Sequence, residues 1–208
     1  MCETLVQVGR ADSADRPDLA AALHAVDTLC ETLRGHMAHE DTHLRPALEA
    51  AEQGATDRTT QQHDQHRQDL DALQAEVRAL RSLEAGARPA AMLQLYRHLA
   101  LFVAENLEHM HIEETAHNAV LWAACDDADI AAIEGRILAG MSPQARLASL
   151  QEIARAVSPQ ELIGLLSGLQ QQAPAPAFVA VLAALQPTQP PARWAYVLQS
   201  LMCAEAVQ

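Results

Sequence analysis

Three long stretches of this sequence carry apolar residues at alternating steps of three and four, the spacing of one buried face of an α-helix. The stretches run from Pro17 to a bend or end at Pro46, from about residue 56 or 59 to Gly86, and from Pro89 to about Ala124. Their apolar stripes include Leu19, Leu23, Val26, Leu29 and Leu33, then Leu70, Leu73, Val77 and Leu80, then Leu95, Leu99 and Phe102. We therefore expect a mainly α-helical protein whose long helices pack through these faces.

Polar residues continue each stripe in the same helical phase. The first and third stretches each contain a His-x-x-x-Glu step, which places an imidazole and a carboxylate one turn apart on the same face. The second stripe, extended backwards by the same steps, reaches two further histidines. The six candidate metal ligands on these inward faces are His36, Glu40, His63, His66, His109 and Glu113.

Burying two carboxylates and four imidazoles is costly unless something compensates them, and a bound cation is the simplest compensation. The alternative is a set of inward polar residues that satisfy one another by hydrogen bonds. Imidazole and carboxylate ligands without thiolate suit iron, manganese or zinc. Six ligands are too many for one tetrahedral zinc and suffice for two ions bridged by carboxylates in a bundle core. We therefore expect a dinuclear site.

The net charge and the cysteines limit the binding partners and the cellular compartment expected for this protein. The formal net charge of −13 predicts no binding to nucleic acid or to an anionic membrane surface. The four cysteines, at positions 2, 30, 125 and 203, stand singly and suggest reduced, buried thiols. The first ten residues include Glu3 and lack the apolar core of a signal peptide, and the longest apolar run, 177–185, is too short to span a bilayer. We expect a cytoplasmic protein that is not a membrane protein.

The histidines divide the chain, since all ten lie at or before His117. We predict a site-bearing domain over residues 1–125 and a helical C-terminal region over 126–208. That region contains start signals for several short helices, among them Ser142-Pro143 and the capping box Ser158-Pro-Gln-Glu161. We expect these helices to pack on the bundle or to cap its first helix, or to form a homodimer or protein-partner surface.

At this point the sequence resembles a known family. The run from His36 through Glu40 to Pro46, the His63-Asp-Gln-His66 step and the His109-Met-His-Ile-Glu113 step are similar, in order, to three helix signatures of hemerythrin-like (HHE cation-binding) domains. The resemblance covers about residues 1–122. It implies an antiparallel up-down four-helix bundle that holds two non-heme irons and binds or senses dioxygen. By this resemblance the four histidines would be terminal ligands, and Glu40 and Glu113 would bridge the irons.

The first helix departs from the family pattern, in which it supplies one more histidine. The loop before the second helix is expected at residues 9–16, so only residues 1–8, about two turns of helix, precede it, and they contain no histidine. Either the protein begins upstream of Met1 or one iron has lost a ligand.

Several other residues near the motifs are weaker candidates. His39 and His43 are four residues apart and fall on the outer side of their helix, and His117 follows Glu113 by four as a reserve ligand. Glu105 lies one turn before His109, where it is expected to accept a hydrogen bond that orients this imidazole.

The resulting functional prediction is a non-heme di-iron protein that binds or senses dioxygen or a related small oxidant, with manganese or zinc as the other metals that fit. Binding is favoured over catalysis because no catalytic residues or substrate pocket emerge from the sequence. Two alternatives stay open: a di-iron oxidoreductase acting on peroxide, oxygen or nitric oxide, and a helical interaction protein with a degenerate metal site.

Overall fold

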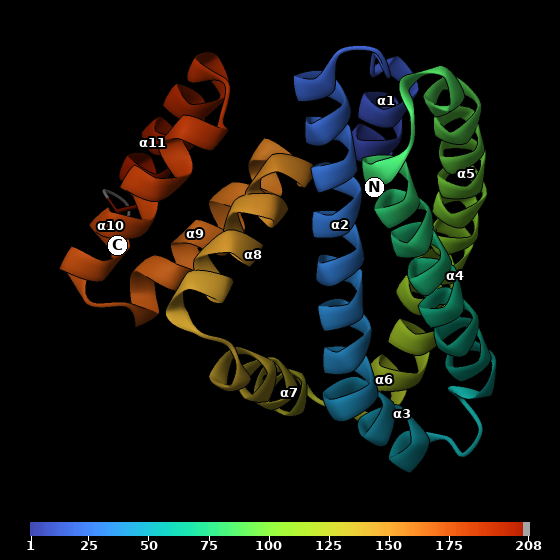
Figure 1. The fold of residues 1–208 in the computed structure, drawn as a ribbon. Coiled ribbons are helices and arrows are strands. Elements are labelled where there is room, and N and C mark those ends of the chain that lie inside the picture. The colour runs from blue at the N-terminus through green and yellow to red at the C-terminus, as the bar shows by residue number, and fades with distance from the viewer. Residues whose placement is uncertain (206–208) are drawn as a thin grey trace. The chain divides into compact units, whose positions relative to one another are not determined.

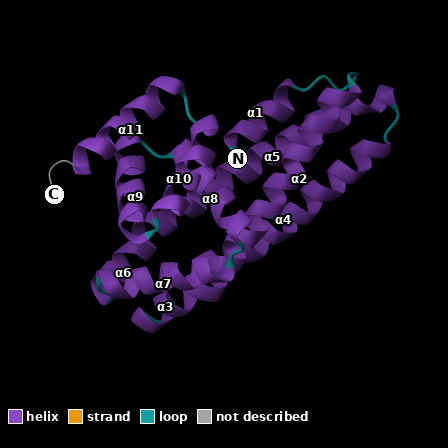
Figure 2. Ribbon diagram, turned by 90° about the vertical axis from the view of Figure 1, so that its left-hand side faces the viewer, coloured by secondary structure: helices purple, strands orange, loops and turns teal. Residues whose placement is uncertain are grey.

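The computed structural model describes residues 1–205, and every regular element in that range is a helix (Figure 2). The chain divides into two compact units, Met1–Ile137 and Leu138–Gln208, each with its own hydrophobic core. The domain boundary expected at residues 125 and 126 lies one helix before this division and stays a prediction.

Four helices of the first unit form a bundle: α1 (Cys2–Arg10), α2 (Arg16–His39), α4 (Asp57–Ser82) and α5 (Arg88–Ile112). Each contacts two others in the order α1, α2, α4, α5 and back to α1 (Figure 1). At 1.5 Å per residue, α1 is about 13 Å long and α2 about 36 Å. The prediction of an all-α bundle with a short first helix, followed by further helices, is confirmed.

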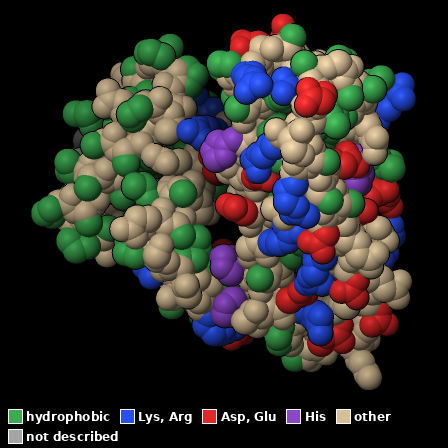
Figure 3. Space-filling view, in the orientation of Figure 1, with side chains coloured by type: hydrophobic (Ala, Val, Ile, Leu, Met, Phe, Trp, Pro, Cys, Tyr) green, Lys and Arg blue, Asp and Glu red, His purple; other side chains and the backbone are tan. Residues whose placement is uncertain are grey.

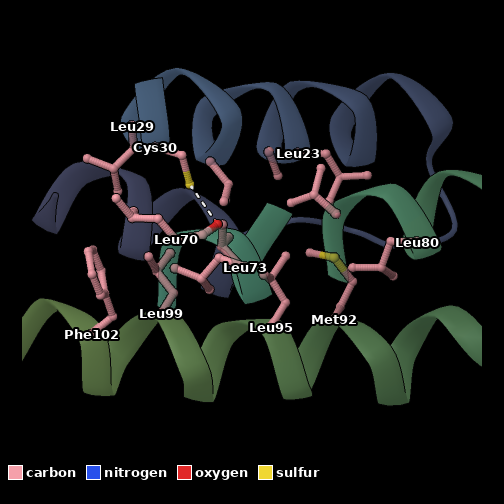
Figure 4. Close-up of a cluster of buried hydrophobic side chains, with 14 of the residues drawn as sticks. Leu23, Leu29, Cys30, Leu70, Leu73, Leu80, Met92, Leu95, Leu99 and Phe102 are labelled. Atoms are coloured by element: carbon pink, nitrogen blue, oxygen red, sulfur yellow. Dashed lines mark hydrogen bonds between the residues drawn. The ribbon is translucent and has the colours of Figure 1, made fainter. Parts of the chain in front are cut away.

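The apolar stripes form the core of this bundle. Side chains of α2, α4 and α5 point toward one another in Figure 4, and the Cys30 thiol lies 4.0 Å from the Leu70 carbonyl oxygen. The residues of the predicted stripes are buried in this core, except the half-buried Leu33. The spacing of apolar residues therefore predicted the packing faces of the long helices.

Two π-helical turns interrupt the long helices, at Glu40–Leu44 and Glu113–His117, and each begins at a carboxylate of the predicted site. They are followed by α3 (Arg45–Ala51) and α6 (Asn118–Ala124). At the first turn Pro46 has no N–H to donate and crowds the preceding carbonyls, so a regular α-helix cannot continue through it. The third predicted helix does run to Ala124, with a π-turn within it, and Pro46 bends rather than ends the first.

The second π-turn shifts the buried face by one residue. Regular α-helical steps of three and four after Glu113 would place Ala116 and Val120 on the inner face. The structure instead buries His117 and Leu121 and exposes Ala116. A π-turn holds more residues than an α-turn, so every side chain after it is rotated relative to the α-helical pattern.

The C-terminal helices are α7 (Asp127–Gly140), α8 (Pro143–Ala156), α9 (Pro159–Gln172), α10 (Ala175–Leu185) and α11 (Pro191–Glu205). Short 3-10 helices occur at Ala85–Ala87 and Gln186–Thr188. The Ser142 hydroxyl accepts a hydrogen bond from the N–H of Ala145, and Ser158 and Glu161 form the predicted capping box. Leu162, Leu166, Leu185 and Val197 anchor the core of this unit.

The cysteines are not uniformly buried. Cys30 is buried and Cys125 half-buried, whereas Cys2 is exposed because α1 turns it away from the core, so its predicted burial was wrong. The side chain of Cys203 lies outside the described part of the structure. Within residues 1–205, no helix combines the length and apolar character needed to cross a membrane.

Candidate metal centre

The centre of the site is a pair of buried imidazoles from two neighbouring helices. His63 of α4 and His109 of α5 have their Nε2 atoms 3.2 Å apart and their ring centroids 4.8 Å apart. Both side chains continue the apolar stripes of their helices, so the packing of α4 against α5 brings the two rings together. Packing of the leucine core therefore positions these nitrogens.

Hydrogen bonds on the outer side fix which ring nitrogen carries the proton. The Nδ1 of His63 lies 3.0 Å from Oδ1 of Asp41, and the Nδ1 of His109 lies 3.1 Å from Oε1 of Gln62. Both partners are oxygen acceptors, so each Nδ1 is the donor, and in the neutral ring each Nε2 is left with a lone pair. The two lone pairs then face each other across the site.

Two carboxylates complete the cluster. The Nε2 of His63 lies 3.4 Å from Oε2 of Glu40, and the Nε2 of His109 lies 3.2 Å from Oε1 of Glu113. One ligand atom from each of the four residues falls within 4.8 Å of the other three. Oε2 of Glu40 is buried and makes no hydrogen bond. A cluster of four converging acceptors with an unsatisfied oxygen fits a bound cation, which would compensate all four atoms at once.

The pKa values of the site residues reflect the same close approach of imidazoles and carboxylates. Burial opposes ionisation of Glu40, but its hydrogen bond with His36 and the proximity of His63 outweigh it and lower the pKa of this carboxyl to about 2. Burial likewise opposes protonation of His63, while the nearby carboxylates of Glu40 and Asp41 raise its pKa above the ordinary value. The carboxylates therefore favour a positive charge at this position, as they would favour a metal ion.

His36 lies at the edge of the site. Its Nε2 is 3.0 Å from Oε1 of Glu40, but 43% of its side chain is exposed, so the expectation that it faces the core was wrong. His36 lies about 30 Å along α2 from Arg16, well beyond the end of the short α1 that covers the first turns. The hydrogen bond to Glu40 raises the pKa of His36.

His66 is buried beside the cluster but outside the group of four. Its ring packs edge-on against His109, with centroids 5.1 Å apart, and against Phe102 at 5.6 Å. Burial, together with His109 and His63, lowers its pKa to about 4, so the ring is neutral at pH 7. The structure thus brings together Glu40, His63, His109 and Glu113 and leaves His36 and His66 on either side.

Two residues that hold the site in place were missed in the sequence. Asp41 and Gln62 are each adjacent in sequence to a stripe residue but do not belong to the stripe, so periodicity could not select them. Gln62, not the expected Glu105, is the hydrogen-bond partner of His109. Arg67 in turn pairs with Asp41.

The remaining histidine candidates differ in how deeply their side chains are buried. His39 and His43 are half-buried and lie outside the four-residue cluster. His117 is buried, with 4% of its surface exposed, and it lines a small pocket together with Glu40, His63 and Glu113.

Comparison with protein families gives an independent assignment. The family model described as the hemerythrin HHE cation binding domain matches residues 1–120, which contain the whole bundle and the four-residue cluster. Comparisons with curated proteins and with solved structures each give no significant match. The match covers more than half of the chain, and the chain therefore belongs to the hemerythrin HHE cation-binding family.

Proposed function

We propose that the bundle holds a non-heme di-iron centre that binds or senses dioxygen or a related small oxidant. The observation that carries this proposal is the pair of imidazole Nε2 atoms 3.2 Å apart, both unprotonated in the neutral rings and flanked by two carboxylates. Such an arrangement is electrostatically unfavourable when empty and favourable around a cation. Membership of a cation-binding family agrees with it.

The proposed ligands are the six residues of the two helical steps and the α4 histidines. Glu40 and Glu113 lie between the imidazoles and are the carboxylates suited to bridging. His63 and His109 would hold one ion, with the neutral ring of His66 beside them. His36, which is hydrogen-bonded to Oε1 of Glu40, would hold the other ion.

The donor chemistry favours iron, while manganese and zinc also accept imidazole and carboxylate ligands. When bound, a pair of irons supplies reversible electron transfer to a small oxidant. The chain's own residues hold and orient the ions: Asp41 and Gln62 keep the imidazole protons on the outer nitrogens. The leucine core excludes water from one side of the site, and the half-exposed His36 borders solvent at its edge.

Metal analysis after anaerobic iron loading tests the proposal. We expect about two irons per chain and a near-ultraviolet absorption band that changes on exposure to oxygen. His109→Ala and Glu40→Ala should lose metal, whereas His24→Ala, which changes an exposed histidine on α2, should keep it. Protein that stays metal-free after loading with iron, manganese or zinc would overturn the proposal. Catalytic turnover of peroxide would favour the oxidoreductase alternative.

We also propose that the C-terminal unit contacts a second copy of the chain or another protein. It exposes several large apolar side chains, namely Ile153, Leu165, Val179, Tyr196 and Met202. Figure 3 shows few charged side chains on the visible face of this unit, in contrast to the bundle. Light scattering after size exclusion tests for a dimer. A monomeric mass for both the wild type and Val179→Glu would contradict self-association.

A further inference from the structure

His117 follows Glu113 by four residues, one helical step along the same face, and is the last residue of the π-turn that begins at Glu113. Its side chain is buried in the bundle. There it lines a pocket of about 10 Å³ together with Glu40, His63 and Glu113. A volume of this size has room for one water-sized group or one metal ion.

The hydrogen bonds around His117 leave one ring nitrogen free to act as an acceptor. The Thr59 hydroxyl lies 3.1 Å from the Thr56 carbonyl oxygen and 3.3 Å from Nε2 of His117. A hydroxyl has one hydrogen, and with this hydrogen directed to the Thr56 carbonyl we assign Nε2 as the donor to the Thr59 oxygen. Nδ1 therefore carries the lone pair, and this buried atom makes no hydrogen bond.

The ring is also uncharged and close to both carboxylates of the site. Burial lowers the pKa of His117, and the nearby Glu113, the Ala55 backbone and Glu40 only partly oppose this shift. His117 lines the small pocket together with Glu40 and Glu113, and His36 is hydrogen-bonded to Glu40 at 3.0 Å. Both imidazoles therefore lie beside Glu40, and neither belongs to the His63–His109 pair.

We propose that His117 is an additional metal ligand through Nδ1, and that it serves the same ion as His36. This inference rests on the proposed metal centre and deepens it. In the described chain, α1 contributes no histidine to the bundle, so the ion beside His36 would have a single imidazole without His117. The π-turn at Glu113–His117 supplies a second imidazole beside the same carboxylates.

The test compares two matched variants of the full chain, His117→Gln and His111→Gln. Both positions lie close to Glu113, but His111 is exposed and His117 is buried. Each protein is loaded anaerobically with iron(II), and separately with zinc(II). Bound metal is measured by elemental analysis and affinity by competition with a chromophoric chelator. Far-ultraviolet circular dichroism confirms that the helices are retained.

We expect His117→Gln to lose one of the two ions or to bind the weaker one about 10-fold less tightly, and His111→Gln to match the wild type. A His117→Gln variant with two ions of unchanged affinity would overturn the role of His117 and leave the metal centre standing. A wild type that binds one ion would overturn the dinuclear character of the centre and this role with it. A wild type that binds no metal would instead defeat the metal centre itself.

A second measurement decides the matter if His117→Gln fails to fold. The ¹⁵N resonances of the histidine rings are recorded for the wild type before and after zinc(II) is added. Ligation through Nδ1 should shift the Nδ1 resonance of His117 while Nε2 keeps its proton. A His117 Nδ1 resonance that zinc(II) does not move would overturn the inference.

Discussion

His63 of α4 and Asp41 of the first π-turn are joined by a hydrogen bond of 3.0 Å between Nδ1 and Oδ1, although they lie 22 residues apart in sequence. Asp41 also pairs with Arg67, one helical turn after His63. A carboxylate behind an imidazole fixes its tautomer and makes the opposite nitrogen a stronger ligand. The π-turn thus contributes both a proposed ligand, Glu40, and the group that orients a second one.

Replacing Asp41 by Asn should weaken metal binding without unfolding the bundle. The variant keeps an oxygen near Nδ1 of His63 but removes the negative charge, and we expect the affinity to fall about 10-fold. Asp64→Asn is the matched control, since Asp64 pairs with the same arginine but does not contact the His63 ring. Isothermal titration with zinc(II) measures both. Equal losses in the two variants would contradict a specific role for Asp41.

The stability of the bundle should depend on the leucine stripe of α4. Leu70 is fully buried, so Leu70→Ala leaves a cavity and should lower the free energy of unfolding by about 2–5 kcal/mol. Leu101 of α5 is 60% exposed, and Leu101→Ala should change it by no more than about 0.5 kcal/mol. Urea unfolding of the metal-free proteins measures both values. Similar values for the two variants would contradict the packing described for α4.

The thiols of Cys2 and Cys30 should differ strongly in reactivity. Burial raises the pKa of the Cys30 thiol to about 11, so almost no thiolate forms at pH 8, and the side chain is also inaccessible. Cys2 is exposed and should react quickly with a disulfide reagent. Comparison of wild type with Cys2→Ser by mass spectrometry assigns the fast site. Rapid labelling of Cys30 in folded protein would contradict its burial.

The capping box at the start of α9 predicts a pH-dependent contribution to stability. Hydrogen bonds from Ser158 lower the pKa of Glu161. A carboxyl with a lowered folded pKa stabilises the fold above its unfolded pKa, and this contribution is lost as the pH falls through the folded pKa. Glu161→Gln should therefore lower the Tm at pH 7, and the difference from wild type should shrink in acid.

Glu152→Gln provides the control for this experiment, because Glu152 is an exposed residue in α8 whose ion pair with Arg155 contributes little. Scanning calorimetry at several pH values measures the Tm of both variants. A Glu161→Gln difference that persists unchanged at low pH would contradict the assigned role of the carboxylate.

Local rules were enough to predict the helices and most of the residue types at the site. A helix buried on one side needs apolar residues at steps of three and four, so the stripes of α2, α4 and α5 were readable in the sequence. The capping box at Ser158 and Glu161 was equally readable, since its contacts are three residues apart. The same periodicity placed Glu40, His63, His109 and Glu113 on inner faces.

Contacts between distant residues defined the geometry of the site. The hydrogen bonds that orient His63 and His109 join residues 22 and 47 positions apart, and no helical period connects their partners. The π-turn at Glu113–His117 leaves Ala116 exposed and buries Leu121 rather than Val120, which a fixed period of 3.6 cannot reproduce. His36 is half exposed because coverage of α2 depends on the length of α1. Helical periodicity therefore determines which residues face the core, whereas packing between the helices determines which of their atoms come into contact.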